Sequence, residues 1–183
     1  ESLPGFDELK KRNADIVAWI KLDGTHIDHP VVRGKDNFEY LTKDADGEFY
    51  QGGSIFLDSG NTGDLSDDYI IIHGHHMMRG AMFSDLSLYL EEEFFCEHET
   101  GELLTPQGDY ALTVLGAGYA DAYDGELYHT GADVTLPLQL TDTCIQKRGL
   151  DFEKGDKLVM LSTCSGDMTS HRIVVFLRAG KVK

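Results

Sequence analysis

The sequence predicts a mainly β fold, built as a barrel or a sandwich. Seven or eight short segments rich in apolar and β-branched residues are separated by clusters of Gly, Pro, Asn, Asp and Ser. These segments do not alternate with helices as the strands of a doubly wound parallel sheet do. We therefore expect mainly antiparallel strands, with one helix before them and further helices inserted between them.

Length and charge narrow the range of functions. The chain has 183 residues of mixed composition, which predicts a single domain over residues 1–183. Its 32 acidic and 16 basic residues give a formal net charge of -16, which argues against a nucleic acid or an anionic lipid surface as the main partner. No apolar run approaches the roughly 20 residues that a membrane-spanning helix requires.

The first half of the chain is expected to begin with a helix and continue with strands. Apolar residues recur on one face between Phe6 and Ile20, which predicts an amphipathic helix over residues 7–20. A turn signal at residues 22–25 ends this helix. The next elements are predicted to be strands at residues 25–32, 53–58 and 69–72, and a short helix at residues 36–41.

The second half is expected to contain a helix over residues 81–90 and a hairpin from residues 103–105 and 110–115. The long connection over residues 120–156 is predicted to carry another helix, with Pro137 near its start, Lys147 and Arg148 in its last turn and Gly149 beyond it. Apolar runs at residues 158–161 and 173–177 predict the last two strands.

Two chemically distinctive residues flank the turn between these last strands. Cys164 ends the first strand and Arg172 begins the second, so we expect a thiol and a cation to face each other across a hairpin. A thiolate attacks carbonyl carbons, and a guanidinium can hold the oxyanion that forms. The pair therefore predicts acyl transfer, whereas a single cysteine in an apolar strand is most often a packed core residue.

A cysteine nucleophile normally needs an imidazole beside it. The predicted strand at residues 69–72 leads into His73, Gly74, His75 and His76, and at most two of these three histidines can share one face. Alternate histidines completed by a carboxylate are also typical of zinc sites, so a zinc-dependent hydrolase using His73, His75 and His76 is the alternative function. A surface domain without catalysis, such as an adhesin or pilus component, is a second alternative.

Four features coincide in this chain: Leu-Ser-Thr-Cys at residues 161–164, the arginine on the next strand, Gly-His-His after an apolar strand, and Met-Phe at residues 82–83. Together they closely resemble the class B sortases, the cysteine transpeptidases of Gram-positive cell surfaces. Segments at residues 17–20, 27–32, 53–58 and 75–77 are similar to segments of that family, in its order. The resemblance implies the closed sortase β-barrel, with a helix in the connection before the cysteine strand.

The resemblance also implies roles for individual residues. Cys164 matches the nucleophile, Arg172 matches the arginine that steadies the oxyanion or the substrate backbone, and the Gly74-His75 pair selects His75 as the general acid and base. His76 would then be a supporting or surface residue. Ser162 and Thr163, directly before the cysteine, are expected to bind substrate, and no cofactor or metal is expected.

The reaction that the resemblance implies is cleavage of a C-terminal sorting signal after threonine, through a thioacyl enzyme. The acyl group would pass to a peptidoglycan cross-bridge amine or a pilin lysine. The partners are thus secreted surface proteins and the cell wall, not nucleic acid. An amino-terminal membrane anchor before Glu1 would hold the domain on the extracellular face of the membrane.

Cys96 and Cys144 bring the number of cysteines to three, which is odd and too few for a disulfide framework. At least one thiol therefore stays free. A bridge between Cys96 and Cys144 is one possibility, but we expect two small buried apolar residues instead.

Overall fold

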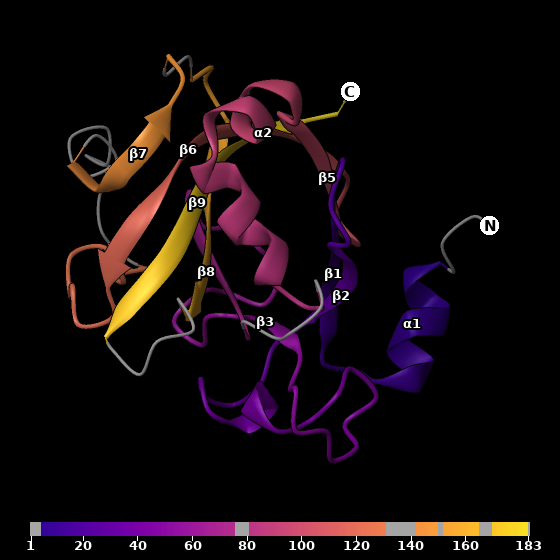
Figure 1. Cartoon of the computed structure of the whole chain (residues 1–183). Helices are drawn as coiled ribbons and strands as arrows, with labels where there is room; N and C mark the ends of the chain where they lie inside the picture. The colour runs from indigo at the N-terminus through magenta and orange to yellow at the C-terminus, as the bar shows by residue number, and fades with distance from the viewer. Residues whose placement is uncertain (1–4, 76–80, 131–141, 150–151, 165–169, 183) are drawn as a thin grey trace.

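The main feature of the computed structural model is a closed β-barrel (Figure 1). The structure describes residues 5–75, 81–130, 142–149, 152–164 and 170–182. Its strands form one sheet in the order β5-β1-β2-β3-β4-β8-β9-β6-β7, and an additional β5–β6 pairing closes all of them except β7 into a barrel. The strands are β1 (Ile16–Leu22), β2 (Asp28–Val32), β3 (Ile55–Leu57), β4 (Tyr69–Gly74), β5 (Thr100–Leu104), β6 (Tyr110–Asp121), β7 (Cys144–Lys147), β8 (Lys157–Cys164) and β9 (His171–Lys181). The predicted mainly β fold with a closed barrel is confirmed.

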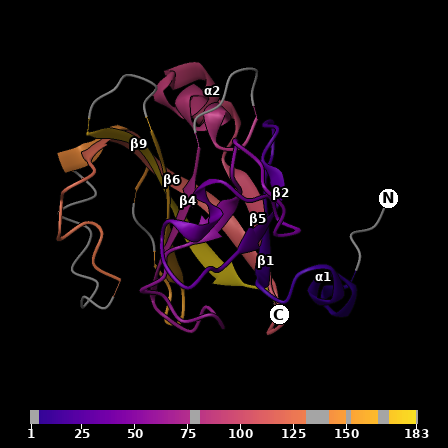
Figure 2. The same ribbon diagram turned by 90° about the horizontal axis from the view of Figure 1, so that it is seen from below.

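Short helices accompany the strands. The helix α1 (Phe6–Arg12) lies outside the barrel beside β1 and β2, as both views show (Figure 1, Figure 2). The 3-10 helix η1 (Glu39–Leu41) lies in the connection from β2 to β3. The 3-10 helix η3 (Ser84–Leu90) and the helix α2 (Glu92–Glu97) lie between β4 and β5. Within the described part of the chain, no helix has the length and apolar character needed to cross a membrane.

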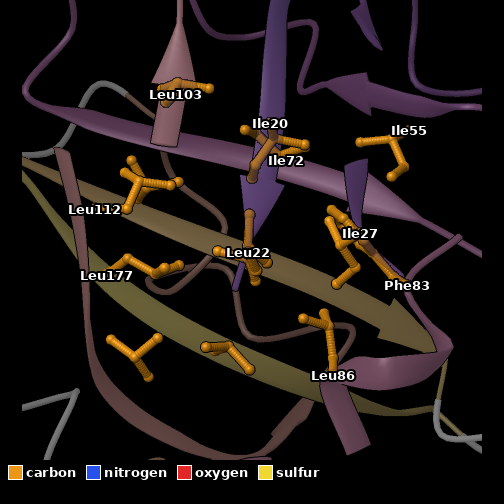
Figure 3. Packing of buried hydrophobic residues seen from close by; sticks show 14 of the residues in the cluster. Ile20, Leu22, Ile27, Ile55, Ile72, Phe83, Leu86, Leu103, Leu112 and Leu177 are labelled. Carbon is orange, nitrogen blue, oxygen red and sulfur yellow. The ribbon is translucent and has the colours of Figure 1, made fainter. Parts of the chain in front are cut away.

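The interior of the barrel is filled by aliphatic and aromatic side chains from strands that are far apart in the sequence. They converge from β1, β3, β4, β5, β6 and β9, together with side chains of the β1–β2 and β4–β5 connections (Figure 3). The labelled residues of this cluster are Ile20, Leu22, Ile27, Ile55, Ile72, Phe83, Leu86, Leu103, Leu112 and Leu177. Burial of this apolar surface is the main stabilising contribution to the fold.

Strands β4, β8 and β9 are buried on both faces. Ile70 and Ile72 of β4 belong to the interior cluster, whereas Tyr69 and Ile71 belong to a second cluster that also contains Met160 of β8. Strands buried on both faces read as continuous apolar runs rather than as an alternating pattern. This explains why these strands were recognisable in the sequence.

The helix predicted over residues 7–20 is wrong in its second half. The helix α1 ends at Arg12, and Asn13 has the extended backbone angles φ -149° and ψ 121°. The side chain of Asn13 ends the helix, since its Oδ1 accepts a hydrogen bond from the Asp15 N–H and its Nδ2 donates to the Ala45 carbonyl. Residues 16–22 then alternate between buried and more exposed positions, as a strand requires. The apolar residues between Phe6 and Ile20 therefore belong to two elements, α1 and β1, and their helix-like spacing is coincidental.

The helix predicted near the end of residues 120–156 ends earlier than expected, since residues 142 and 143 are helical and a strand follows them directly. Its expected last turn is the strand β7, which pairs with β6 so that Gly116 lies opposite Lys147 and Gly118 lies opposite Cys144. A Cβ at Gly118 would collide with the carbonyl oxygen of Thr143. The two glycines therefore let β7 approach β6 closely, which local sequence signals do not reveal. Pro137 and the expected start of the helix lie outside the described residues.

Candidate active site

The ends of three neighbouring strands bring together the positions of the predicted catalytic residues. Strands β8 and β9 are antiparallel neighbours (Figure 1), and their register places Cys164 opposite Arg172. Strands β4 and β8 are parallel, and their pairing ends with Gly74 opposite Thr163. The next residues along these two strands are His75 and Cys164. The backbone thus places residues 75, 164 and 172 in one row at one end of the barrel.

His75 is held by the connection between β2 and β3. Its Nε2 lies 3.0 Å from the carbonyl oxygen of Leu41. Because a carbonyl oxygen only accepts hydrogen bonds, Nε2 carries the hydrogen in this contact, and Nδ1 is left to exchange a proton. Gly53, at φ +60°, makes this arrangement possible, since a Cβ there would lie 2.7 Å from the Leu41 oxygen and 2.9 Å from Cδ2 of His75.

His73 has a different set of partners. Its Nε2 lies 2.8 Å from Oδ2 of Asp58, and its ring is stacked on the ring of Tyr128 with 6.0 Å between centroids. Burial acts to raise the pKa of Asp58, but hydrogen bonds from His73 and the Gly60 N–H outweigh it, so that the pKa lies below its ordinary value. Asp58 is therefore a carboxylate at neutral pH.

The predicted zinc alternative finds no matching arrangement in the described part of the chain. No group of three or more His, Cys, Asp and Glu side chains there is placed to hold a metal ion. His73 and His75 each direct Nε2 at a protein oxygen, of Asp58 and Leu41 respectively. His76 lies outside the described residues.

Ser162 and Thr163, the predicted substrate-binding residues, are buried in the wall of the barrel with 2% and 1% of their surface exposed. The hydroxyl of Ser162 lies 2.7 Å from the hydroxyl of Tyr128. The hydroxyl of Thr163 is buried without a hydrogen-bond partner among the described residues. In this structure neither side chain offers a surface to a peptide.

The two other cysteines are both free. The possible bridge between Cys96 and Cys144 does not form, and Cys96 is exposed on α2, whereas we expected it to be buried. Cys144, at the start of β7, is half-buried, and burial raises its pKa to about 11.

This difference predicts unequal reactivity of the two thiols. At pH 8, iodoacetamide should label Cys96 readily, and it should label Cys144 about a hundredfold more slowly than a thiol at the ordinary pKa of 9.0, because only the thiolate reacts. Peptide mapping by mass spectrometry measures both rates in the Cys164→Ala variant. Similar labelling of the two thiols at pH 8 would contradict the prediction.

Sequence reasoning missed several contributors to this site: the Leu41 carbonyl, Asp58 and Tyr128. Asp58 follows the apolar strand β3 directly, and polar residues at strand ends often carry function, so this signal was present. Leu41 and Tyr128 lie in connections whose paths depend on tertiary packing. No local pattern distinguishes them.

Comparisons with known proteins agree with this geometry. No protein-family model matches the chain. It is 34% identical over 185 residues to sortase B of Staphylococcus aureus (strain NCTC 8325 / PS 47). The aligned region covers 98% of this chain and 76% of that protein. A solved S. aureus sortase B–substrate complex has a TM-score of 0.85 and 33% identity, over 97% of this chain and 85% of that chain. A Streptococcus pyogenes class B sortase involved in pilus biogenesis has a TM-score of 0.86 and 31% identity, over 95% and 97% of the two chains.

The closed barrel and its solved counterparts define the class of protein, which is a sortase, a cysteine transpeptidase. The alignment with S. aureus sortase B, at 34% identity, covers nearly the whole chain. The chain therefore belongs to the sortase B family. The resemblance to the class B sortases, inferred from the sequence motifs, is confirmed.

Proposed function

We propose that the enzyme cleaves a sorting signal after threonine and transfers the threonine carbonyl to an amine. The thiolate of Cys164 attacks the carbonyl carbon, the amide C–N bond breaks, and the protonated His75 gives its proton to the departing amine. An incoming amine then gives a proton to His75 and attacks the thioester, the C–S bond breaks, and the sulfur of Cys164 is released. Arg172 stabilises the oxyanion of both tetrahedral intermediates.

The observation that carries this proposal is the row of residues 75, 164 and 172 on adjacent strands. Hydrogen-bonded strands fix the spacing of these positions before substrate arrives, and such preorganisation lowers the barrier to reaction. The Leu41 carbonyl occupies Nε2 of His75, so the proton transfers of this proposal are assigned to Nδ1. A zinc hydrolase or an idle adhesin would leave Cys164 and Arg172 without a role.

The proposed substrate is the C-terminal sorting signal of a secreted surface protein, and the proposed place of action is the extracellular face of the membrane. The relatives support a peptide substrate, since S. aureus sortase B has been solved as a substrate complex. The S. pyogenes relative is involved in pilus biogenesis, which supports a pilin lysine as one acceptor beside a cross-bridge amine. Ser162 and Thr163 are proposed to support β8 from within the barrel wall, because both are buried.

Mass spectrometry of the protein incubated with a panel of sorting-signal peptides tests this function. We expect an adduct on Cys164 that adds the mass of the peptide acid ending at threonine less one water, as a thioester requires. Adding a cross-bridge peptide with a free amine to one sample, and a lysine peptide to another, should show which amine discharges the adduct. Absence of an adduct with every peptide, or an adduct on Cys96 alone, would overturn the proposal.

Replacing Arg172 with Lys should lower kcat for peptide cleavage by about a hundredfold. The ammonium of lysine keeps the charge but lacks the planar fork of donors that can hold an oxyanion. Steady-state kinetics with a fluorogenic sorting peptide measure the effect. Arg178→Lys is the matched control, because Arg178 lies on the same strand, beside Asp156 at 3.8 Å. Equal losses in the two variants would contradict a special role for Arg172.

A further inference from the structure

A continuous set of contacts lies two residue positions along the strands from the proposed catalytic row. It runs from Asp58, at the end of β3, to His73 of β4, then to Tyr128 in the connection after β6, and finally to Ser162 of β8. His73 and Ser162 are direct partners in the β4–β8 pairing. Two residues further along the same strands are His75 and Cys164. The set therefore spans the two strands that carry the proposed base and nucleophile.

Asp58 is the fixed end of this set. Its side chain is only 11% exposed, and its two carboxylate oxygens accept hydrogen bonds from the Asn37 side chain and the Gly60 N–H, each at 2.8 Å, besides the contact with His73. Three partners from three separate positions hold the carboxylate in one orientation. A carboxylate only accepts, so Nε2 of His73 carries the hydrogen in their 2.8 Å contact.

His73 connects Asp58 to Tyr128, because its Nε2 contacts the carboxylate and its ring is stacked on the tyrosine ring. The imidazole contacts the ring of Phe56, at 5.2 Å between centroids, and the ring of Tyr128, whose plane is 12° from parallel. The Tyr128 hydroxyl then meets the Ser162 hydroxyl at 2.7 Å. A rotation of the His73 ring would thus move Tyr128 and, through its hydroxyl, the part of β8 that precedes Cys164.

We propose that Asp58 and His73 are positioning residues, which hold β4 and β8 so that His75 and Cys164 keep a reactive separation. The inference rests on the proposed function, since it concerns the geometry of the same transpeptidase site. Neither residue touches the reacting atoms in this scheme. Displacements of about 1 Å at a reacting centre cost about a hundredfold in rate, so a modest loosening of this wall has a measurable effect.

The test measures the alkylation rate of Cys164 by iodoacetamide, with Cys96 of the same molecule as internal reference. Asp58→Asn should lower the Cys164 rate about tenfold and leave the Cys96 rate unchanged. With a sorting peptide that acylates the wild type, kcat should fall by a similar factor while KM stays within about twofold. His73→Phe keeps the ring but removes the hydrogen bond, so it should match Asp58→Asn, and the double variant should lose no more than either alone.

Lys157→Met is the matched control. Lys157 is a buried polar residue at the other end of β8, about 23 Å from Cys164 for seven residues of extended strand, and it donates hydrogen bonds to the carbonyls of Ser66 and Asp67. This substitution should lower the melting temperature and leave the Cys164 rate and kcat unchanged. If Lys157→Met lowers the Cys164 alkylation rate and kcat as much as Asp58→Asn does, the effect is general destabilisation and the proposal is overturned.

Asn37→Ala keeps the proposal testable if Asp58→Asn fails to fold. It removes one of the donors to Asp58 and leaves His73 intact, so the Cys164 rate should fall about threefold. Wild-type rates in folded Asn37→Ala and His73→Phe would overturn the proposal. If the wild type forms no adduct with any peptide, the proposed function fails, whereas the alkylation comparison still decides whether Asp58 and His73 position Cys164.

Discussion

Replacing Cys164 with Ala is expected to lower kcat for sorting-peptide cleavage by about 10⁴-fold or more and to abolish the covalent adduct. Alanine has no sulfur to form the thioester, so both steps of the proposed reaction are lost together. Binding of the peptide should change little, because the substitution removes a single sulfur atom from the enzyme. Cleavage of a fluorogenic peptide, intact-protein mass spectrometry and fluorescence anisotropy of a labelled peptide measure the three quantities.

Cys96→Ser is the matched control for this experiment. Cys96 is the exposed free thiol on α2, and its loss should leave cleavage and adduct formation at wild-type levels. Turnover retained in Cys164→Ala would defeat the transpeptidase mechanism proposed for this chain. Turnover lost in both variants would point to a requirement for folding rather than for a nucleophile.

The second large effect is expected for His75→Ala, which should lower kcat by about 10³-fold. Without the imidazole, no group in the proposed scheme gives a proton to the departing amine or takes one from the incoming amine. KM should change less, because the ring acts on protons rather than on peptide affinity. Pre-steady-state kinetics with mass spectrometry separate adduct formation from adduct discharge, and both steps should slow.

Two further measurements make the His75 prediction specific. His26→Ala should keep wild-type kinetics, because the His26 side chain is 81% exposed and pairs with Asp85. Free imidazole added to His75→Ala should restore part of the rate, since a small base can enter the space left by the ring. A wild-type kcat in His75→Ala would contradict the prediction and show that His75 is not the general acid and base.

The fold was predictable where local and tertiary preferences agree. The apolar runs of β4, β8 and β9 are buried on both faces, so their composition alone identified them. The hairpin of β5 and β6 was found because its turn residues fit between two strand-forming segments. The predictions failed at α1 and β7. There the side chain of Asn13 and the close approach at Gly118 decide the structure through contacts distant in sequence.

The candidate site was predictable in outline for a related reason. A hairpin fixes its own register, so Cys164 opposite Arg172 followed from the sequence of one turn and two strands. Choosing His75 among the histidines needed the family motif. The contact of His73 with Asp58 could not be predicted, because it joins β4 to the end of β3 through side chains whose directions depend on the packed barrel.

The parallel pairing of β4 with β8 has a consequence for the folding of the enzyme. Residues 75 and 164 are roughly 90 positions apart, and a pairing over such a distance forms late, after the entropy of closing a long loop has been overcome. Before this step, the imidazole and the thiol lie on two segments of the chain that are not yet paired with each other. A growing or unfolded polypeptide therefore has no assembled transpeptidase site, and the onset of sorting-peptide cleavage would time the closure of the barrel during refolding.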